Sequence, residues 1–210
     1  MNSPLKTSVL AAVSLAALCS NAPLSAADAK KFKVIDAFNS IDPKTVEVAD
    51  IVAKPVSTPD PVHKKALELV ADFAKPDSYP RIVKKLPPNF ITGKKYSGVH
   101  FWYRSNSETT SAISLSGSPR KDGRPTDFNI HLKGKPEWQE ALIDFTQFKN
   151  YDVKVWDKAA NAQKTYPGGE SPKEEDFELI NRISIVTHVG MRGTNVKSHF
   201  MISGLSLIEK

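Results

Sequence analysis

The stretch "GVHFWYRSN", residues 98–106, is the segment that decides how the chain folds. With the two-residue period of a β-strand, its side chains divide between two faces. The apolar set that is typical of a protein core is Val99, Phe101 and Tyr103. The set on the opposite face is His100, Trp102 and Arg104. We therefore expect a strand whose outer face either binds a ligand or is covered by another part of the chain.

The same alternation recurs in roughly ten short runs along the chain, separated by turn signals such as Asp122-Gly123 and Gly168-Gly169. Short strands without long helical periods predict an all-β fold, an antiparallel β-sandwich or jelly roll. The residues expected inside it are Val99, Phe101, Tyr103, Ile113, Leu115, Phe128, Ile130, Ile183 and Ile185.

One segment has a helical signal, "SPKEEDFELI", residues 171–180. Ser171 is a suitable N-cap, Pro172 suits the first helical position, and Glu174 completes a capping box. We expect one short helical turn there. The polar segment 150–172 that precedes it is predicted to be a long loop, and long loops between sandwich strands often bind ligands.

The first 27 residues have the layout of a secretory signal peptide. Lys6 is followed by an apolar run, residues 9–18, which is too short to span a membrane, so no transmembrane segment is expected. The small residues before Asp28 fit a cleavage site. Leu18 in front of Cys19 is a poor match to a lipoprotein signal, so cleavage is favoured over lipidation. We expect an exported protein that is periplasmic, extracellular or at the cell surface.

The mature chain, residues 28–210, is expected to be a single domain without cysteine, and therefore without disulfides or thiolate chemistry. Removal of the signal peptide takes away one of the 29 lysines and arginines and none of the 23 acids, which leaves a net charge of +5. The basic residues are scattered pairs, which favours a solvated surface over a nucleic-acid groove and slightly favours anionic glycans among sugar ligands.

The chain lacks the motifs of common enzymes and cofactor sites: there is no phosphate-binding glycine loop, HExxH or GxSxG sequence, and no EF-hand loop. The five histidines have no metal-ligand spacing, so we expect no metal and no cofactor. A glycosidase carboxylate pair stays open, because such a pair is defined by its separation in space.

Five segments carry a family resemblance: "KALELVADF", "YSGVHFWYRSN", "WQEALIDFTQF", "LINRISIVT" and "FMISGLSLIEK". Their order resembles that of a galactose-binding-like jelly roll. The chain is most similar to family-eleven carbohydrate-binding modules and to the complex I intermediate-associated protein thirty group. The resemblance covers nearly the whole mature chain and implies sugar binding on a concave sheet.

Such modules often hold a structural calcium with an acidic residue after the first strand and an aspartate in the last strand. This chain has Asn39 after its first strand and Ser203-Gly204 in its last. Calcium needs several hard oxygen ligands, usually including carboxylates. The departures therefore predict that no calcium is bound.

The outward-facing polar residues give a candidate sugar cleft, because rings stack on sugars and polar side chains bond their hydroxyls. Trp102 is the candidate stacking ring and Arg104 the candidate clamp. Ser114 and Ser116 are small enough to leave room for the ligand. The proposed ligand-binding residues are His100, Trp102, Arg104, Asn129, His131 and His188, with Ser184 on the same strand as His188.

Two interpretations of Trp102 stay open: it is a binding residue, or it is core, covered by the 150–172 loop with Arg104 paired to a carboxylate there. Core is favoured for Trp138. Exposed aromatics of the loop are the second choice of ligand contacts: Tyr151, Trp156 and Tyr166. The preferred function is a non-catalytic carbohydrate-binding protein for an oligo- or polysaccharide. A protein–protein adaptor or assembly factor and a sandwich-fold lyase or hydrolase are the alternatives.

Overall fold

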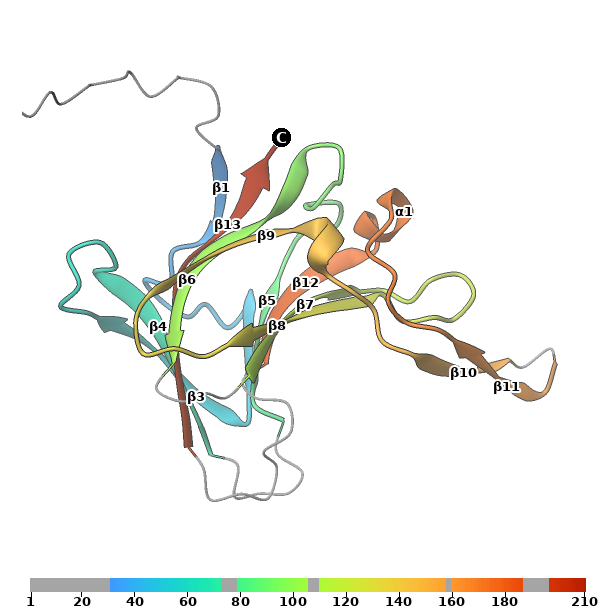
Figure 1. The fold of residues 1–210 in the computed structure, drawn as a ribbon, viewed down its shortest axis with the longest axis horizontal. Coiled ribbons are helices and arrows are strands. Elements are labelled where there is room, and N and C mark those ends of the chain that lie inside the picture. Colours follow the sequence, from blue (N-terminus) through green and yellow to red (C-terminus); the bar gives the residue numbers. More distant parts are fainter. Residues whose placement is uncertain (1–30, 73–78, 106–109, 158–159, 187–196) are drawn as a thin grey trace, which may run out of the picture.

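Two antiparallel sheets pack face to face in the computed structural model, which describes residues 31–72, 79–105, 110–157, 160–186 and 197–210 (Figure 1). The predicted antiparallel β-sandwich with a jelly-roll architecture is confirmed. Within the described residues, no helix is long and apolar enough to cross a membrane.

The first sheet, sheet A, has the strand order β3-β4-β13-β6-β9, and β1 also pairs with β13. The long strand β13 pairs with β4 through its first half, as at Ile202 opposite Leu67, and with β1 through its second half, as at Ile208 opposite Phe32. The strands are β1 (Phe32–Asp36), β3 (Ile51–Ser57), β4 (Lys65–Asp72), β6 (Tyr96–Ser105), β9 (Gln139–Asp144) and β13 (Lys197–Glu209).

The second sheet, sheet B, has the order β2-β5-β12-β7-β8. Its central strand β12 pairs with β5 on one side and β7 on the other, so that Ser184 lies opposite both Val83 and Ser114. The strands are β2 (Val46–Ala49), β5 (Arg81–Lys85), β7 (Thr110–Gly117), β8 (Asp127–Lys133) and β12 (Ile180–Val186).

The core lies between the sheets and consists of the apolar residues that alternate along each strand. Phe101 from sheet A and Phe128 from sheet B are both fully buried in it. All nine residues expected inside face the core, and only Ile130 is merely half-buried. Because a one-residue shift in register would expose all of these side chains, the apolar pattern fixes which face of each strand is outward.

The segment 150–172 is not the single loop that the sequence predicted. It contains a hairpin of β10 (Val153–Asp157) and β11 (Ala162–Tyr166), with Val155 opposite Lys164. The hairpin projects from the sandwich on the right in Figure 1. Its strands are only five residues long and lie in a two-stranded sheet of their own, which explains why its polar sequence gave a weak strand signal.

The helical turn occurs where it was predicted but begins later. It spans α1 (Glu174–Phe177) and is preceded by Lys173, so Ser171 is not its cap. The Ser171 hydroxyl instead donates to the Thr146 carbonyl at 2.7 Å. The turn is held by Asp176, whose carboxylate accepts a hydrogen bond from the Lys173 backbone N–H at 2.9 Å. A separate 3-10 turn, η1 (Phe145–Gln147), follows β9 and was not predicted.

Candidate functional site

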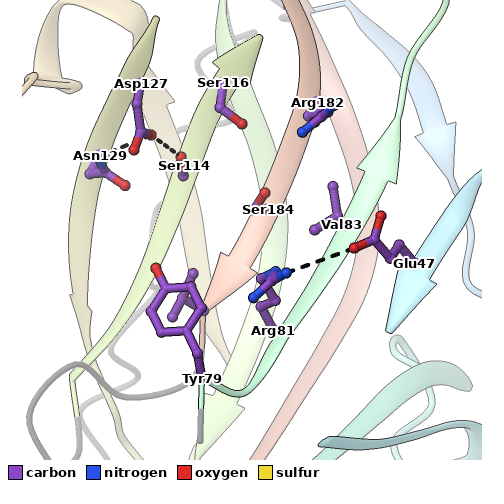
Figure 2. A pocket seen from close by; sticks show the side chains of 11 residues that line it. Glu47, Tyr79, Arg81, Val83, Ser114, Ser116, Asp127, Asn129, Arg182 and Ser184 are labelled. Atoms are coloured by element: carbon purple, nitrogen blue, oxygen red, sulfur yellow. Dashed lines mark hydrogen bonds and ion pairs between the residues drawn. The ribbon is translucent and has the colours of Figure 1, made fainter. Parts of the chain in front are cut away.

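A groove crosses the outer face of sheet B, over the strands β5, β12 and β7 (Figure 2). Its floor is formed by small side chains, Ser184, Ser114 and Ser116, at the middle of the sheet. Its volume is about 200 Å³, below the range of roughly 300–1,000 Å³ that holds drug-sized ligands. The groove therefore suits one small unit of a ligand, or one unit of a longer chain. Its larger lining residues are Glu47, Tyr79, Arg81, Val83, Asp127, Asn129, Arg182 and Val186.

Hydrogen-bond acceptors and donors lie on the β7–β8 side of this groove. The Asp127 carboxylate accepts from the Ser114 hydroxyl at 2.5 Å and from the Asn129 side-chain amide at 3.2 Å, both through Oδ1 (Figure 2). These two bonds fix the carboxylate while Oδ2 takes no hydrogen bond from any described residue. Asp127 is thus held ready to accept a further donor from a ligand.

An aromatic ring joins this side from the segment after η1. The backbone of Lys149 pairs with Asn129 in both directions, at 2.7 and 3.0 Å, and extends sheet B by one bridge. Two residues later, the Tyr151 hydroxyl lies 2.6 Å from Nε2 of His131. Partial burial raises the pKa of Tyr151, with smaller contributions from the nearby Asp127 and Tyr79. About half of the Tyr151 side chain stays exposed.

Cations lie on the opposite side of the groove, on β5 and β12. The Arg81 guanidinium lies over the Tyr79 ring, 5.3 Å from its centroid. Arg81 and Lys85 approach the same carboxylate of Glu47 at 3.8 and 3.7 Å, which are ion-pair distances longer than hydrogen bonds. Arg182 is exposed and makes no ion pair with any residue in the described part of the chain.

The structure divides the predicted cleft between the two sheets. Asn129 and His131 lie on the outer face of sheet B, with Asn129 in the groove and His131 beside it. The other strand of the prediction, β6, belongs to sheet A, so the core separates its outward residues from the groove. The expectation of one shared cleft was therefore wrong for His100, Trp102 and Arg104. His188 lies outside the described residues.

The outward residues of β6 form a separate aromatic cluster with the turn between β3 and β4, residues 58–64. His63, from that turn, is buried between two indole rings, 4.6 Å from Trp102 and 4.7 Å from Trp138. Arg104 lies over the Trp138 ring at 5.2 Å and donates from Nε to the Met201 sulfur at 3.1 Å. Trp102 is thus covered by the turn, residues 58–64, and not by the 150–172 segment, which contacts sheet B instead.

The other end of this cluster is more open. His100 lies 3.1 Å from a Glu140 carboxylate oxygen and stacks on Phe32 at 4.4 Å.

The three aromatic residues of the 150–172 segment that were proposed as ligand contacts lie in different places: Tyr151 reaches the groove side of sheet B, whereas Trp156 lies exposed on the projecting hairpin. Tyr166 lies beneath Arg124, 4.9 Å from its guanidinium carbon.

Side chains at or near the two positions where calcium was considered, Asn39 and Ser203, make contacts with other residues. Asp36, at the end of β1, bonds the Lys84 ammonium at 2.7 Å, and Lys84 also donates to the Thr45 hydroxyl at 3.1 Å. The Ser203 hydroxyl donates to the Lys65 carbonyl at 2.8 Å. Among the residues described, no group of three or more His, Cys, Asp or Glu side chains is placed to hold a metal ion.

Several lining residues were missed by sequence reasoning. Arg182 is the outward neighbour of Ser184 in "NRISIV", so alternation alone would have found it. Arg81 was likewise visible as the first outward residue of "RIVKKL". Tyr79 precedes its strand and Glu47 lies on an edge strand, and no local pattern places either beside β12.

Comparison with known proteins identifies solved structures that have a similar fold. No protein-family model and no curated protein matches the chain. A family 11 carbohydrate-binding module from Clostridium thermocellum, solved with a β-1,3-1,4-mixed-linked tetrasaccharide, is similar over 84% of this chain and 95% of that one, with 15% identity and a TM-score of 0.57. A second family 11 module, from a cellulosomal cellulase of the same organism, covers 87% and 97%, with 16% identity and a TM-score of 0.57.

An exo-β-agarase is similar over 86% of this chain but only 25% of its own, with 13% identity and a TM-score of 0.54. At these identities the likeness establishes the fold. The chain has the jelly-roll architecture of family 11 carbohydrate-binding modules, as its sequence predicted. The resemblance to the complex I intermediate-associated group is not confirmed.

Proposed function

We propose that this protein is a non-catalytic carbohydrate-binding protein that holds an oligo- or polysaccharide in the groove of sheet B. The observation that carries the proposal is the groove itself, with a floor of serines between a hydrogen-bonding side and a cationic side. A module with the same fold was solved with a bound tetrasaccharide, which supports the assignment.

The chemistry of the groove suits a sugar. A pyranose presents hydroxyls at its rim and C–H groups on its faces, so it needs paired donors and acceptors beside an aromatic ring. Asp127 and Asn129 supply an acceptor and an amide, Tyr79 supplies a ring in the groove, and Tyr151 supplies a second ring beside it. The serine floor allows the sugar to approach the sheet, since it adds little bulk.

The carboxylates that line the groove argue against glycoside hydrolysis. Glu47 lies on β2 and Asp127 on β8, the two edge strands of sheet B. Four strand spacings separate them, about 19 Å along the sheet. The two carboxyl groups of a glycosidase lie only about 5–9.5 Å apart. These two residues therefore cannot act as a catalytic pair, which supports a binding role.

We also propose export, on the basis of the signal-peptide pattern of residues 1–27. A periplasmic, cell-surface or extracellular location would bring the groove into contact with polysaccharides. N-terminal sequencing of the protein purified from its own cells tests this point, with a mature start at Asp28 as the expected result. A start at Met1 would contradict it.

Affinity electrophoresis in gels that contain different polysaccharides tests the binding function. We expect retardation by at least one polysaccharide and loss of that retardation in Ser116→Trp, which fills the floor of the groove. Ser118→Trp places the same ring on an exposed residue outside the groove and is the matched control. If no polysaccharide binds, the adaptor function becomes the better explanation, and the hairpin of β10 and β11 is the surface to test.

A further inference from the structure

We propose that the groove selects a sugar that carries a negative group, a carboxylate or a sulfate, and that Arg182 binds this group. This inference rests on the proposed function and adds the chemical class of the ligand. It depends on how charge is distributed across the groove rather than on the net charge of the chain.

One row of side chains crosses the groove at right angles to the strands. The pairing of the strands places Arg182 beside Lys85 on one side and Ser116 on the other, and Ser116 beside Asp127. Arg182 and Asp127 are thus two strand spacings apart, about 10 Å, with only a serine between them. A sugar ring seated over Ser116 would have a cation at one end and a carboxylate at the other (Figure 2).

The cationic end carries more charge than its neighbours neutralise. Arg81, Lys85 and Arg182 lie on β5 and β12, and Glu47 is the one described carboxylate that pairs with any of them. Its contacts at 3.8 and 3.7 Å are loose, and its side chain is half exposed. Arg182 has no ionic partner among the described residues. This side therefore presents at least one guanidinium that a ligand can pair.

Arg182 and Asp127, at the two ends of the row, would bind different groups of one sugar. A guanidinium binds carboxylate or sulfate oxygens through parallel N–H bonds, which neutral hydroxyls match poorly. Asp127 would repel a second negative group and accept from a hydroxyl through its open Oδ2. The ligand thus has its negative group toward β12 and hydroxyls toward β8. An acidic sugar fits this polarity, whereas a neutral sugar leaves Arg182 unpaired.

Matched pairs of polysaccharides test the proposal with the purified protein. The pairs are polygalacturonate against its methyl ester, and a sulfated galactan against its desulfated form, each with the same backbone. We expect at least tenfold tighter binding to the acidic member of one pair, measured by calorimetry. The pair that shows the preference tells whether the group is a carboxylate or a sulfate. Poly-glutamate is included as a polyanion without sugar rings.

Three variants locate the effect. Arg182→Gln should reduce the preference for the acidic member about tenfold, and Arg182→Lys should restore part of it. Lys33→Gln makes the same charge change on exposed β1 of sheet A and should change affinity less than twofold. The melting temperature of each variant is measured to confirm that it is folded.

Equal binding within every pair, a preference for the neutral member, or an equal effect of Lys33→Gln would overturn the acidic-sugar proposal and leave sugar binding intact. Binding of poly-glutamate with the same dependence on Arg182 would overturn it as well. No binding to any polysaccharide, acidic or neutral, would overturn both this proposal and the proposed function.

Discussion

The Tyr151 hydroxyl and the His131 imidazole lie 2.6 Å apart, although 20 residues separate them in the chain. The contact exists because the backbone of Lys149 bonds that of Asn129 and guides the following residues along the edge of β8. A ring from outside the sheet is thereby held beside the groove.

Removal of this ring should weaken sugar binding more than it weakens folding. We expect Tyr151→Ala to lower glycan affinity by about 1 kcal/mol, because a stacked ring is lost from an exposed position. Tyr151→Phe keeps the ring and should lose less. Titration of both variants with the polysaccharide retained in gels measures the difference. Equal affinity in the alanine variant and the unmodified protein would show that Tyr151 does not contact the ligand.

Trp102 is expected to contribute to stability and not to sugar binding in the groove. Its ring packs on His63 on the outer face of sheet A, so Trp102→Ala should destabilise the protein by about 3 kcal/mol, at the low end of the range for large-to-small core substitutions. Urea denaturation measures this. The matched control is Trp156→Ala, since Trp156 is 58% exposed and its loss should cost less than about 0.5 kcal/mol. Lost glycan binding in a stable Trp102→Ala variant would contradict the assignment.

The alternation in the sequence indicated the inward and outward faces but not the sheet to which each strand belongs. Phe101 and Phe128 were both placed inside, and both are fully buried. Their outward neighbours, Trp102 and Asn129, were then assigned to one cleft, although β6 and β8 lie in opposite layers. The two-residue alternation of apolar and polar side chains contains no information about which strands pair, because strand neighbours are set by long-range contacts. The candidate site was therefore found only in part.

Among the ionic contacts in the described structure, the pair of Arg120 and Asp176 should cost the most folding stability when one partner is substituted. Two hydrogen bonds of 2.7 and 2.8 Å join them, and the Asp176 side chain is fully buried. Arg120→Met leaves that carboxylate buried without its ionic partner, with only the Lys173 backbone N–H, among the described residues, still bonded to it, and we expect a loss of about 3–5 kcal/mol of stability. The double variant Arg120→Met with Asp176→Leu should lose less than the single variant. Thermal and urea unfolding provide both values; a larger loss in the double variant would contradict this account.

Acid should weaken the contacts of Glu68 on sheet A. A hydrogen bond from Lys54, 2.9 Å away, is the largest cause that holds the pKa of Glu68 below its usual 4.5; burial opposes it, and a second hydrogen bond from His199, 2.6 Å away, adds to the lowering. The stabilisation is thus complete above pH 4.5 and is lost as the pH falls through the lowered pKa. Glu68→Gln should cost about 1 kcal/mol at pH 7 and almost nothing at pH 2. Glu137→Gln, on an exposed residue, is the control. A difference that stays constant from pH 7 to pH 2 would refute this linkage.

Calcium should have little effect on thermal stability. The Asp36 carboxylate accepts a hydrogen bond from the Lys84 ammonium, and the Ser203 hydroxyl donates to the backbone carbonyl of Lys65. Melting curves in chelator and in millimolar calcium should therefore nearly coincide. A clear upward shift in calcium would reveal a site in the native state, since a ligand that binds the folded protein raises its apparent stability.

Two local features of the fold were beyond the reach of the sequence pattern. The hairpin of β10 and β11 is too short and too exposed to show an apolar face, although "VKVW" does alternate. His63 lies in the short turn 58–64, which has no strand or helix pattern, yet it is buried because the indole rings of Trp102 and Trp138 enclose it. Burial of this kind depends on tertiary neighbours and not on the local sequence.

The pairing of β1 with the end of β13 has a practical consequence for attachment. Phe32 and Ile208 lie opposite each other in sheet A, whereas the groove lies on the outer face of sheet B. A bead, dye or fused partner joined near either residue is therefore separated from the groove by the thickness of the sandwich. Coupling through Lys210 should leave the groove facing solution, so the protein can be immobilised as a probe for polysaccharides without blocking its own site.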